Sequence, residues 1–188
     1  MTTVTTSKPV TADEWLRTPD PPSGGRYELV RGRLIEVSPS STRSNEVAIE
    51  VARRLGNHIR EHKLGRFGGS EGGFLLASNP DTVRAPDVWF VRAERVASGR
   101  MPDTFFAGAP DLVVEVLSPS DRTGDIWQRV GQYLDAGAQL VWVIDPHTEA
   151  AAAFPADGFP IIIGPDGALD GGDVVPGFVL PLRDLFDA

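Results

Sequence analysis

The sequence predicts a single mixed α/β domain, in which helices flank a central β-sheet. The apolar segments 111–118 and 139–145 have the character of buried strands, and residues 124–136 between them have the pattern of a helix. The chain has 188 residues, 41% of them hydrophobic, which is enough for one core, and it shows no internal repeat or linker. We therefore expect a flexible tail over residues 1–10 and one domain over residues 11–188.

The domain is expected to begin with a short helix and a hairpin. Thr11 and Glu14 have the spacing of a capping box, which predicts a helical turn around Trp15. A loop rich in proline and glycine follows this turn. Two apolar runs then flank Arg31 and Gly32, a pattern that is typical of a β-hairpin.

A long amphipathic helix is the strongest local prediction in the chain. Ser41 or Thr42 can cap its start, and Leu64 and Gly65 mark its end. Apolar residues recur at helical spacing and form the stripe that we expect to face the core, comprising Val47, Ile49, Val51, Leu55 and Ile59.

Strands and turns dominate the rest of the sequence. Segments 66–77 and 82–91 predict short strands divided by glycine-rich and Asn-Pro-Asp turns. Gly137 ends the helix that precedes the strand at 139–145. The last part of the chain is rich in Gly, Pro, Asp and Ala, which favours short strands, with a final helical turn at residues 182–186.

Composition narrows the functional classes. The chain has no cysteine, which excludes disulfides, thiolate metal sites and cysteine nucleophiles. The N-terminal sequence lacks the pattern of a secretory leader, and no apolar run is long enough to span a membrane, so we expect a soluble, cytoplasmic protein. The net charge of -8 argues against a general nucleic-acid coat, but it is compatible with a nuclease that has a local basic rim.

Two carboxylates at buried positions are the main clue to function. Asp87 opens an apolar run, and Glu115 lies inside a buried strand, where alternation places it on the same face as Val113. A buried carboxylate costs roughly several kcal/mol unless a cation or a donor compensates it. A divalent cation shared by Asp87 and Glu115 would compensate both, whereas a structural ion pair with a nearby arginine would compensate Glu115 alone.

The order of these segments resembles the Uma2 family of endonucleases, which belongs to the PD-(D/E)XK superfamily. The resemblance covers residues 11–188 and rests on five segments: YELVRGRLIEVSP, VRAPDVWFV, PDLVVEVLSPSDR, DIWQRVGQYLDAGAQLVWVIDP and VLPLRDLF. It implies a restriction-endonuclease-like fold, a mixed β-sheet flanked by helices with an extra N-terminal hairpin and C-terminal short strands. It also implies hydrolysis of DNA with Mg²⁺ or Mn²⁺ as the cofactor, and it makes a homodimer a reasonable expectation.

The resemblance assigns roles to three acidic residues. Asp87 matches the aspartate of the PD motif, and Glu115 matches the acidic residue of (D/E)XK. Both are therefore expected to be catalytic residues and metal ligands. Glu28, in YELV, matches an acidic position in the first strand of the family and is an additional site candidate.

The sequence also departs from the family pattern. The superfamily's lysine is expected two residues after Glu115, where this chain has Leu117. Relatives carry a lysine on the following helix in the pattern D-x-x-x-K-x-x-x-Y, which here reads Asp125, Arg129 and Tyr133. Arg129 can therefore serve as the phosphate-facing group, or it can form a surface pair with Asp125. Many relatives also have a histidine near the start of the long helix, about where this chain has Ser44.

Two functions from different classes remain open on the sequence alone. The first is a metal-dependent endonuclease that hydrolyses DNA, with Asp87 and Glu115 as ligands and Arg129 facing the phosphate. The second is a catalytically decayed module of the same fold that binds nucleic acid or regulates another process. Metal binding distinguishes the two, because only the nuclease requires a shared cation.

Overall fold

The computed structural model describes residues 8–96 and 99–186. Residues 1–7 of the expected tail lie outside this part of the chain, while the backbone N–H of Val10 donates to the carbonyl oxygen of Gly32 (2.8 Å). The helices are α1 (Ala12–Trp15), α2 (Thr42–His62), α3 (Thr123–Asp135) and α4 (Arg183–Phe186), with the short 3₁₀ helix η1 (Ala93–Arg95). The strands are β1 (Arg26–Val30), β2 (Arg33–Val37), β3 (Gly65–Gly69), β4 (Phe74–Ala77), β5 (Thr82–Arg84), β6 (Val88–Arg92), β7 (Phe106–Ala107), β8 (Leu112–Val116), β9 (Leu140–Asp145), β10 (Ala150–Pro155), β11 (Ile161–Ile163), β12 (Ala168–Asp170) and β13 (Val179–Pro181).

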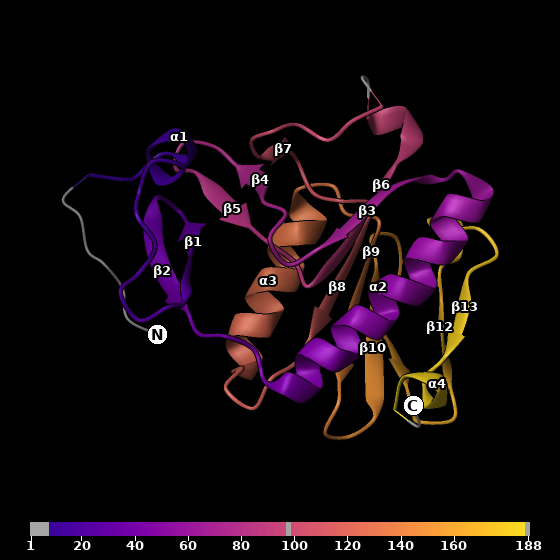
Figure 1. Ribbon diagram of the computed structural model, residues 1–188. Coiled ribbons are helices and arrows are strands. Elements are labelled where there is room, and N and C mark those ends of the chain that lie inside the picture. The colour runs from indigo at the N-terminus through magenta and orange to yellow at the C-terminus, as the bar shows by residue number, and fades with distance from the viewer. Residues whose placement is uncertain (1–7, 97–98, 187–188) are drawn as a thin grey trace.

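A six-stranded mixed sheet forms the centre of the fold. Its strand order is β11-β10-β9-β8-β6-β3, and only the β8–β9 pair in it is parallel. The two strands of that pair are joined by α3, which gives the strand, helix, strand unit that the sequence predicts. Helix α2 lies across one face of this sheet and α3 covers the other (Figure 1). Strand β8 is therefore buried on both sides.

A second sheet stands beside the first and carries the predicted N-terminal hairpin. Its strand order is β2-β1-β5-β4-β7. The hairpin turn contains Arg31 (φ 49°) and Gly32 (φ 71°), and two consecutive positive φ values are what a tight two-residue turn between twisted strands requires. The short pair β12–β13 and helix α4 complete the C-terminal part. The predicted mixed α/β fold, with its extra hairpin and C-terminal short strands, is confirmed.

Capping side chains set the starts of the first two helices, as predicted. The Thr11 hydroxyl accepts from the N–H of Glu14, and the Glu14 carboxylate accepts from the N–H of Thr11. Ser41, rather than Thr42, caps α2 by accepting from the N–H of Ser44. Among the described residues, no helix has both the length and the apolarity needed to cross a membrane.

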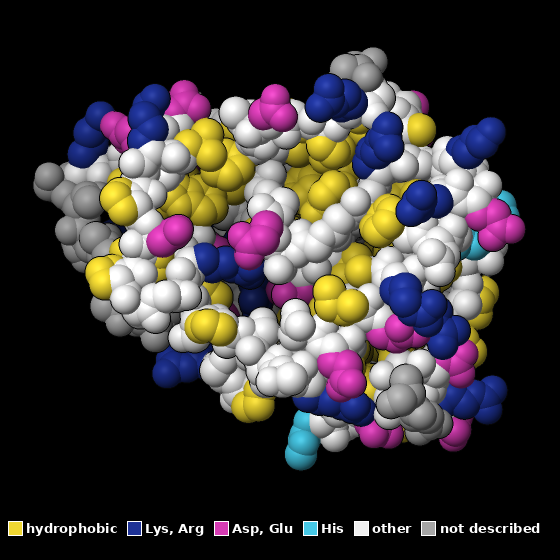
Figure 2. Space-filling model, in the orientation of Figure 1, with side chains coloured by type: hydrophobic (Ala, Val, Ile, Leu, Met, Phe, Trp, Pro, Cys, Tyr) yellow, Lys and Arg dark blue, Asp and Glu magenta, His cyan; other side chains and the backbone are white. Residues whose placement is uncertain are grey.

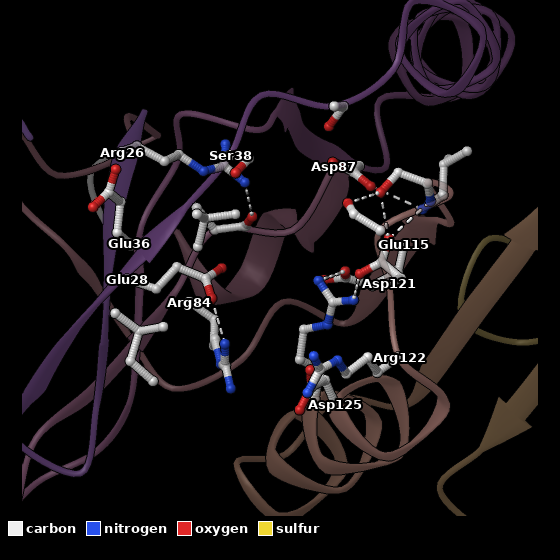
Figure 3. A pocket seen from close by; sticks show the side chains of 18 of the residues that line it. Arg26, Glu28, Glu36, Ser38, Arg84, Asp87, Glu115, Asp121, Arg122 and Asp125 are labelled. Carbon is white, nitrogen blue, oxygen red and sulfur yellow. Dashed lines mark hydrogen bonds and ion pairs between the residues drawn. The ribbon is translucent and has the colours of Figure 1, made fainter. Parts of the chain in front are cut away.

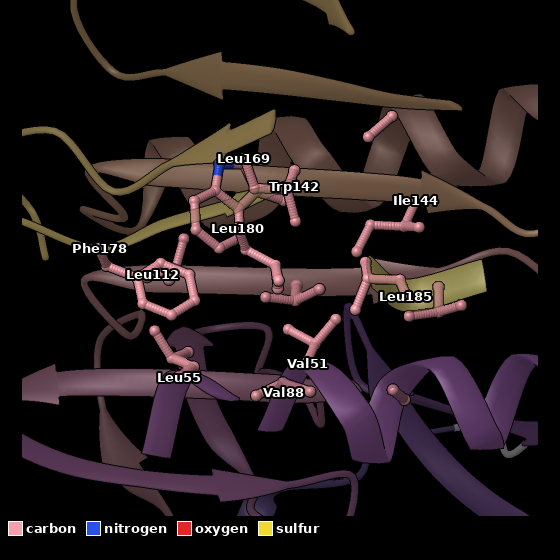
Figure 4. Packing of buried hydrophobic residues seen from close by; sticks show 14 of the residues in the cluster. Val51, Leu55, Val88, Leu112, Trp142, Ile144, Leu169, Phe178, Leu180 and Leu185 are labelled. Carbon is pink, nitrogen blue, oxygen red and sulfur yellow. The ribbon is translucent and has the colours of Figure 1, made fainter. Parts of the chain in front are cut away.

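The main core lies between α2, the central sheet and the C-terminal strands. Val51 and Leu55 of α2 pack with Val88 and Leu112 from the sheet, while Trp142 lies on the side of the C-terminal segment (Figure 4). The other apolar residues labelled in this view are Ile144, Leu169, Phe178, Leu180 and Leu185. This packing holds β6 and β8 side by side, which positions the carboxylates described below.

One residue of the predicted core stripe was placed wrongly. Val47, Val51, Leu55 and Ile59 are fully buried, but the side chain of Ile49 is 61% exposed. Two residues correspond to about 200° of rotation in a helix, so Ile49 points away from its neighbours Val47 and Val51. Its exposed position becomes relevant to the second cavity described below.

Two helical glycines differ in their surroundings and should respond to alanine in opposite ways. A Cβ atom at Gly56 of α2 would lie 2.3 Å from the ring of Phe67, whereas one at Gly131 of α3 would meet nothing within 4 Å. We expect Gly131→Ala to raise the free energy of unfolding by about 0.5–1 kcal/mol through helix propensity. Gly56→Ala should lower it by up to about 2 kcal/mol, because overpacking outweighs the same gain. Urea unfolding of both variants tests this, and stabilisation by Gly56→Ala would show that Phe67 yields freely.

Candidate active site

Sheet register brings Asp87 and Glu115 to the same level of two neighbouring strands. Asp87 directly precedes β6, which runs antiparallel to β8 and pairs Val88 with Val114. Asp87 therefore lies next to the position of Glu115. Both residues line one cavity of about 320 Å³. Figure 2 shows this region as a hollow between the β1–β2 hairpin and α2, with basic and acidic side chains inside it.

The carboxylate of Asp87 is held by the backbone of the adjacent strand. Its Oδ2 atom accepts a hydrogen bond from the N–H of Val116 (2.8 Å). Burial raises the pKa of Asp87, although this hydrogen bond and the charges of Arg26 and Arg129 act in the opposite direction. A carboxylate has about four lone-pair positions, so one bond fixes the orientation of the group and leaves capacity for another ligand.

Glu115 shares one face of β8 with Val113, as the alternation of the strand predicts, and this face packs against α3. Only 5% of the residue is exposed. Its Oε1 accepts from the Tyr133 hydroxyl (2.9 Å), and its Oε2 lies 3.2 Å from Nη1 of Arg129. Burial raises the pKa of Glu115 to about 7. The positive charge of Arg129 lowers this pKa, but the negative charges of Asp87 and Glu28 offset that effect.

Arg129 enters the site from α3 and bridges two carboxylates. Besides Glu115, it contacts Asp121, whose Oδ1 lies 2.5 Å from Nη2. Burial works against the charge of the guanidinium, but Glu115 and Asp121 outweigh it and raise the pKa of Arg129. The alternative surface pair with Asp125 does not form among the described ion pairs, although Asp125 lines the cavity. The arginine partner that the structural alternative predicted for Glu115 is present.

Asp121 belongs to this constellation, and the sequence analysis missed it. Its Oδ2 accepts from both the N–H (2.8 Å) and the hydroxyl (2.9 Å) of Ser118, which fixes the loop after β8. Burial works to raise the pKa of Asp121, but the hydrogen bonds from Ser118 and the charge of Arg129 prevail and lower it. The available signal was the Ser-x-x-Asp spacing directly after the strand, which is common in polar turns.

The opposite wall of the cavity comes from the second sheet. Glu28 of β1 and Arg84 of β5 form a buried ion pair, and Nε of Arg84 donates to the side-chain carbonyl of Gln132 (2.9 Å). Arg26 also lines the cavity, and its Nη1 donates to the carbonyl oxygen of Ser70 (2.8 Å). Figure 3 shows Asp87, Glu115 and Asp121 on one side, with Arg26, Glu28 and Arg84 facing them. An arginine inside the predicted strand segment 82–91 was the sequence signal for Arg84.

The two departures from the family pattern have local explanations. Leu117 is half-buried and packs against the apolar cluster beneath α3, so it does not supply a cation. Arg129 provides the positive charge in its place. Ser44 is buried, and its hydroxyl donates to the carbonyl oxygen of Leu117 (2.7 Å), which ties the start of α2 to the end of β8.

The six site residues predicted from the sequence gather in one place. Asp87, Glu115, Arg129, Glu28 and Asp125 line the cavity, while Tyr133 lies fully buried behind it and contacts Glu115. Burial and the charge of Glu115 raise the pKa of Tyr133, so it remains a hydrogen-bond donor at neutral pH. The arrangement combines oxygen ligands of high negative charge with a half-buried guanidinium, which suits a phosphate ester held by a hard cation.

Comparisons with known proteins identify the family. Among solved structures, the chain is similar to a protein from Anabaena variabilis described as "a putative nuclease belonging to DUF820", with 20% sequence identity and a TM-score of 0.80. The similarity covers 95% of this chain and 98% of that one, and at this identity it shows the fold. No curated protein matches the chain. Residues 12–183 match the family described as "Uma2: Putative restriction endonuclease", and the chain therefore belongs to the Uma2 family.

Proposed function

We propose that this chain is a metal-dependent nuclease that hydrolyses DNA phosphodiester bonds, with Asp87 and Glu115 as metal ligands and Arg129 as the phosphate-facing group. The observation that carries the proposal is the meeting of the buried Glu115 carboxylate, the half-buried Asp87 carboxylate and the half-buried Arg129 guanidinium at the wall of a single open cavity. Membership of the family described as "Putative restriction endonuclease" supports the reaction class.

The donor set fits Mg²⁺ or Mn²⁺. Burial raises the pKa of both Asp87 and Glu115, which means that the protein alone does not fully compensate their charges. In the described part of the chain, no group of three or more His, Cys, Asp or Glu side chains could hold an ion together. Two carboxylates suffice for Mg²⁺, because this ion commonly retains several waters and binds substrate phosphate oxygens. When bound, the ion would neutralise charge on the phosphate and lower the pKa of an attacking water.

Arg129 is suited to electrostatic stabilisation of the transition state. A guanidinium can donate two parallel hydrogen bonds to phosphate oxygens, and Asp121 keeps it at the cavity even if the contact with Glu115 is exchanged for a cation. The raised pKa of Arg129 makes it unsuitable as a general base. Tyr133 would act through Glu115, whose carboxylate it orients.

A decayed, non-catalytic module remains the second candidate. It is favoured by the pairing of Glu115 with Arg129, because this ion pair compensates Glu115 without a metal. The raised pKa of Asp87 argues against it, since a purely structural network would be expected to stabilise that charge as well.

Metal ions should stabilise the folded protein through the two carboxylates. We expect Mg²⁺ or Mn²⁺ at about 100 times its Kd to raise the melting temperature by roughly 5–10 °C, because the ion binds only the folded state. Asp87→Asn and Glu115→Gln should lose most of this shift. Glu61→Gln, at an exposed position of α2, serves as the control and should retain it. Equal shifts in all four proteins would place the ion elsewhere.

Replacement of Arg129 tests the catalytic role. Arg129→Ala should reduce cleavage of plasmid or single-stranded DNA on the order of 10²-fold or more, as expected when a transition-state contact is lost. Arg129→Lys should retain measurable activity, because an ammonium group can still contact phosphate as a point charge.

The control for this series is Arg60→Ala on the exposed side of α2, which should cleave like wild type. Cleavage is compared at a temperature at which circular dichroism shows all variants folded, since Arg129→Ala leaves Glu115 without its cation. No cleavage by wild type and Arg129→Lys with either metal would instead support the decayed module.

The pH dependence of stability without metal reports on Glu115. The pKa of this group is about 7 in the folded protein against 4.5 ordinarily, so between these values the folded state binds more protons. Stability from this group therefore falls as the pH rises from 5 to 8. In urea unfolding with EDTA, the free energy of unfolding of Glu115→Gln should rise relative to that of wild type as the pH increases over this range. The free energy of unfolding of Glu61→Gln should not. Parallel curves for Glu115→Gln and wild type would contradict a desolvated Glu115.

A further inference from the structure

A second cavity of about 340 Å³ lies beside the first and shares Ser40 and Asp87 with it. One wall is the surface of α2 that carries Asn45, Ile49 and Ala52. The facing wall is the turn Gly69–Gly72 between β3 and β4, with Trp89 beneath it. Its size falls within the range of about 300 to 1,000 Å³ that is usual for small-molecule sites.

The lining of the second cavity is unsuited to phosphate. No lysine or arginine is among its lining residues, and the two charged residues there, Glu71 and Asp87, are both acidic. Phosphate groups are bound mainly by Arg and Lys side chains or by helix N-termini. The first turn of α2 borders the cavity, but the N–H groups of Ser44 and Asn45 there already donate to the hydroxyl and the carbonyl oxygen of Ser41. The ligand of this cavity should therefore be a neutral group, in contrast to the first cavity with its arginines.

We call the space between the two walls the slot; most of its lining residues are small, and Ala48, Ile49 and Ala52 of α2 are apolar. On α2, Asn45, Ala48, Ile49 and Ala52 follow the spacing of one helix face. Ile49 is the exposed isoleucine whose side chain does not contribute to the core. Across the slot, the turn cannot carry a side chain at Gly72, because its Cβ would lie 2.5 Å from Nε1 of Trp89.

Polar groups at the slot supply donors and acceptors for an edge of a planar ligand. Ser40, Asn45 and Ser70 all line the cavity, and the side chain of each can both donate and accept hydrogen bonds. A slot with apolar faces and a few polar groups is the usual environment of a bound heterocyclic ring. A nucleobase has this shape and this pattern of edge groups.

We propose that the second cavity binds the base and sugar of the nucleotide adjacent to the scissile phosphate. This inference rests on the proposed function, in which Asp87 binds the metal in the first cavity. Because Asp87 also lines the second cavity, a nucleoside bound there would lie next to the metal. Single-strand binding proteins draw much of their affinity from stacking of bases on aromatic rings, which tolerates many sequences, and here the aliphatic side chain of Ile49 would take the place of such a ring. In this proposal, Ile49 packs against the base and Asn45 forms hydrogen bonds with its edge.

A titration of the metal-free protein with a nucleoside tests the slot directly. With ¹⁵N-labelled protein in EDTA, thymidine should give saturable amide shifts confined to residues 45–52 and 69–72 and their immediate surroundings. 2-Deoxyribose, which lacks the base, should give no saturable shift there. Equal effects of the two compounds, or thymidine shifts located elsewhere, would overturn the proposal.

Variants at exposed positions assign the contact without disturbing the fold. The double variant Asn45→Ala/Ile49→Ala should weaken thymidine binding roughly tenfold, in line with the loss of one base contact. Ile162→Ala removes a similarly exposed isoleucine on the distant edge strand β11 and should bind like wild type. Unchanged thymidine affinity in the double variant would refute the assignment of Asn45 and Ile49.

The metal readout separates this inference from the proposed function. The double variant should keep the full melting shift with Mn²⁺, because it leaves both carboxylates in place. Thymidine binding without any Mn²⁺ shift in wild type would contradict the metal-dependent nuclease and leave the nucleoside slot standing. A normal Mn²⁺ shift without thymidine binding would do the reverse.

Discussion

Glu115 places a carboxylate in a strand that is covered on both faces. The desolvation of this carboxylate is unfavourable, and neighbouring side chains have to compensate it. The charge is met by Tyr133 and Arg129, both from α3. That helix is the crossover between β8 and β9, so its register against the sheet determines whether the two side chains reach Glu115. Breaking a buried pair by removing one partner costs about 3–5 kcal/mol. The site and the packing of α3 therefore depend on the same contacts.

The protein compensates the charges of Asp87 and Glu115 only in part, and this affects both the stability of the fold and the proposed function. Asp87 receives one backbone hydrogen bond and no direct ion pair among the described contacts, and burial raises its pKa together with that of Glu115. Groups with shifted pKa values beside a cavity are typical of functional sites, although structural networks can shift them too. In the proposed function, a divalent cation would resolve the remaining repulsion, so that metal binding would stabilise the fold and support cleavage through the same two residues.

Arg129 stands where relatives carry a lysine, and this difference keeps the positive charge but removes a group that can exchange a proton. The side chain of Leu117 packs into the apolar cluster under α3, so a positively charged side chain has to come from α3 instead. Arg129 of α3 supplies this charge, and its guanidinium also contacts Asp121. An arginine so placed can bind phosphate bidentately but cannot exchange a proton at neutral pH. In the proposed mechanism, proton transfer therefore has to involve solvent or substrate, while Arg129 supplies electrostatics.

The sequence by itself determined what depends on local periodicity and on capping. These features were the hairpin at Arg31–Gly32, the two long helices and the face of β8 that carries Glu115, because backbone geometry repeats over a few residues. Tertiary structure decided which groups meet. Local spacing suggested Asp125 as the partner of Arg129, but the fold brings Glu115 and Asp121 closer. Apolar character suggested a buried Ile49, but the helix turns it outward. Contacts between distant segments depend on sheet register and helix orientation, which no short stretch of sequence encodes.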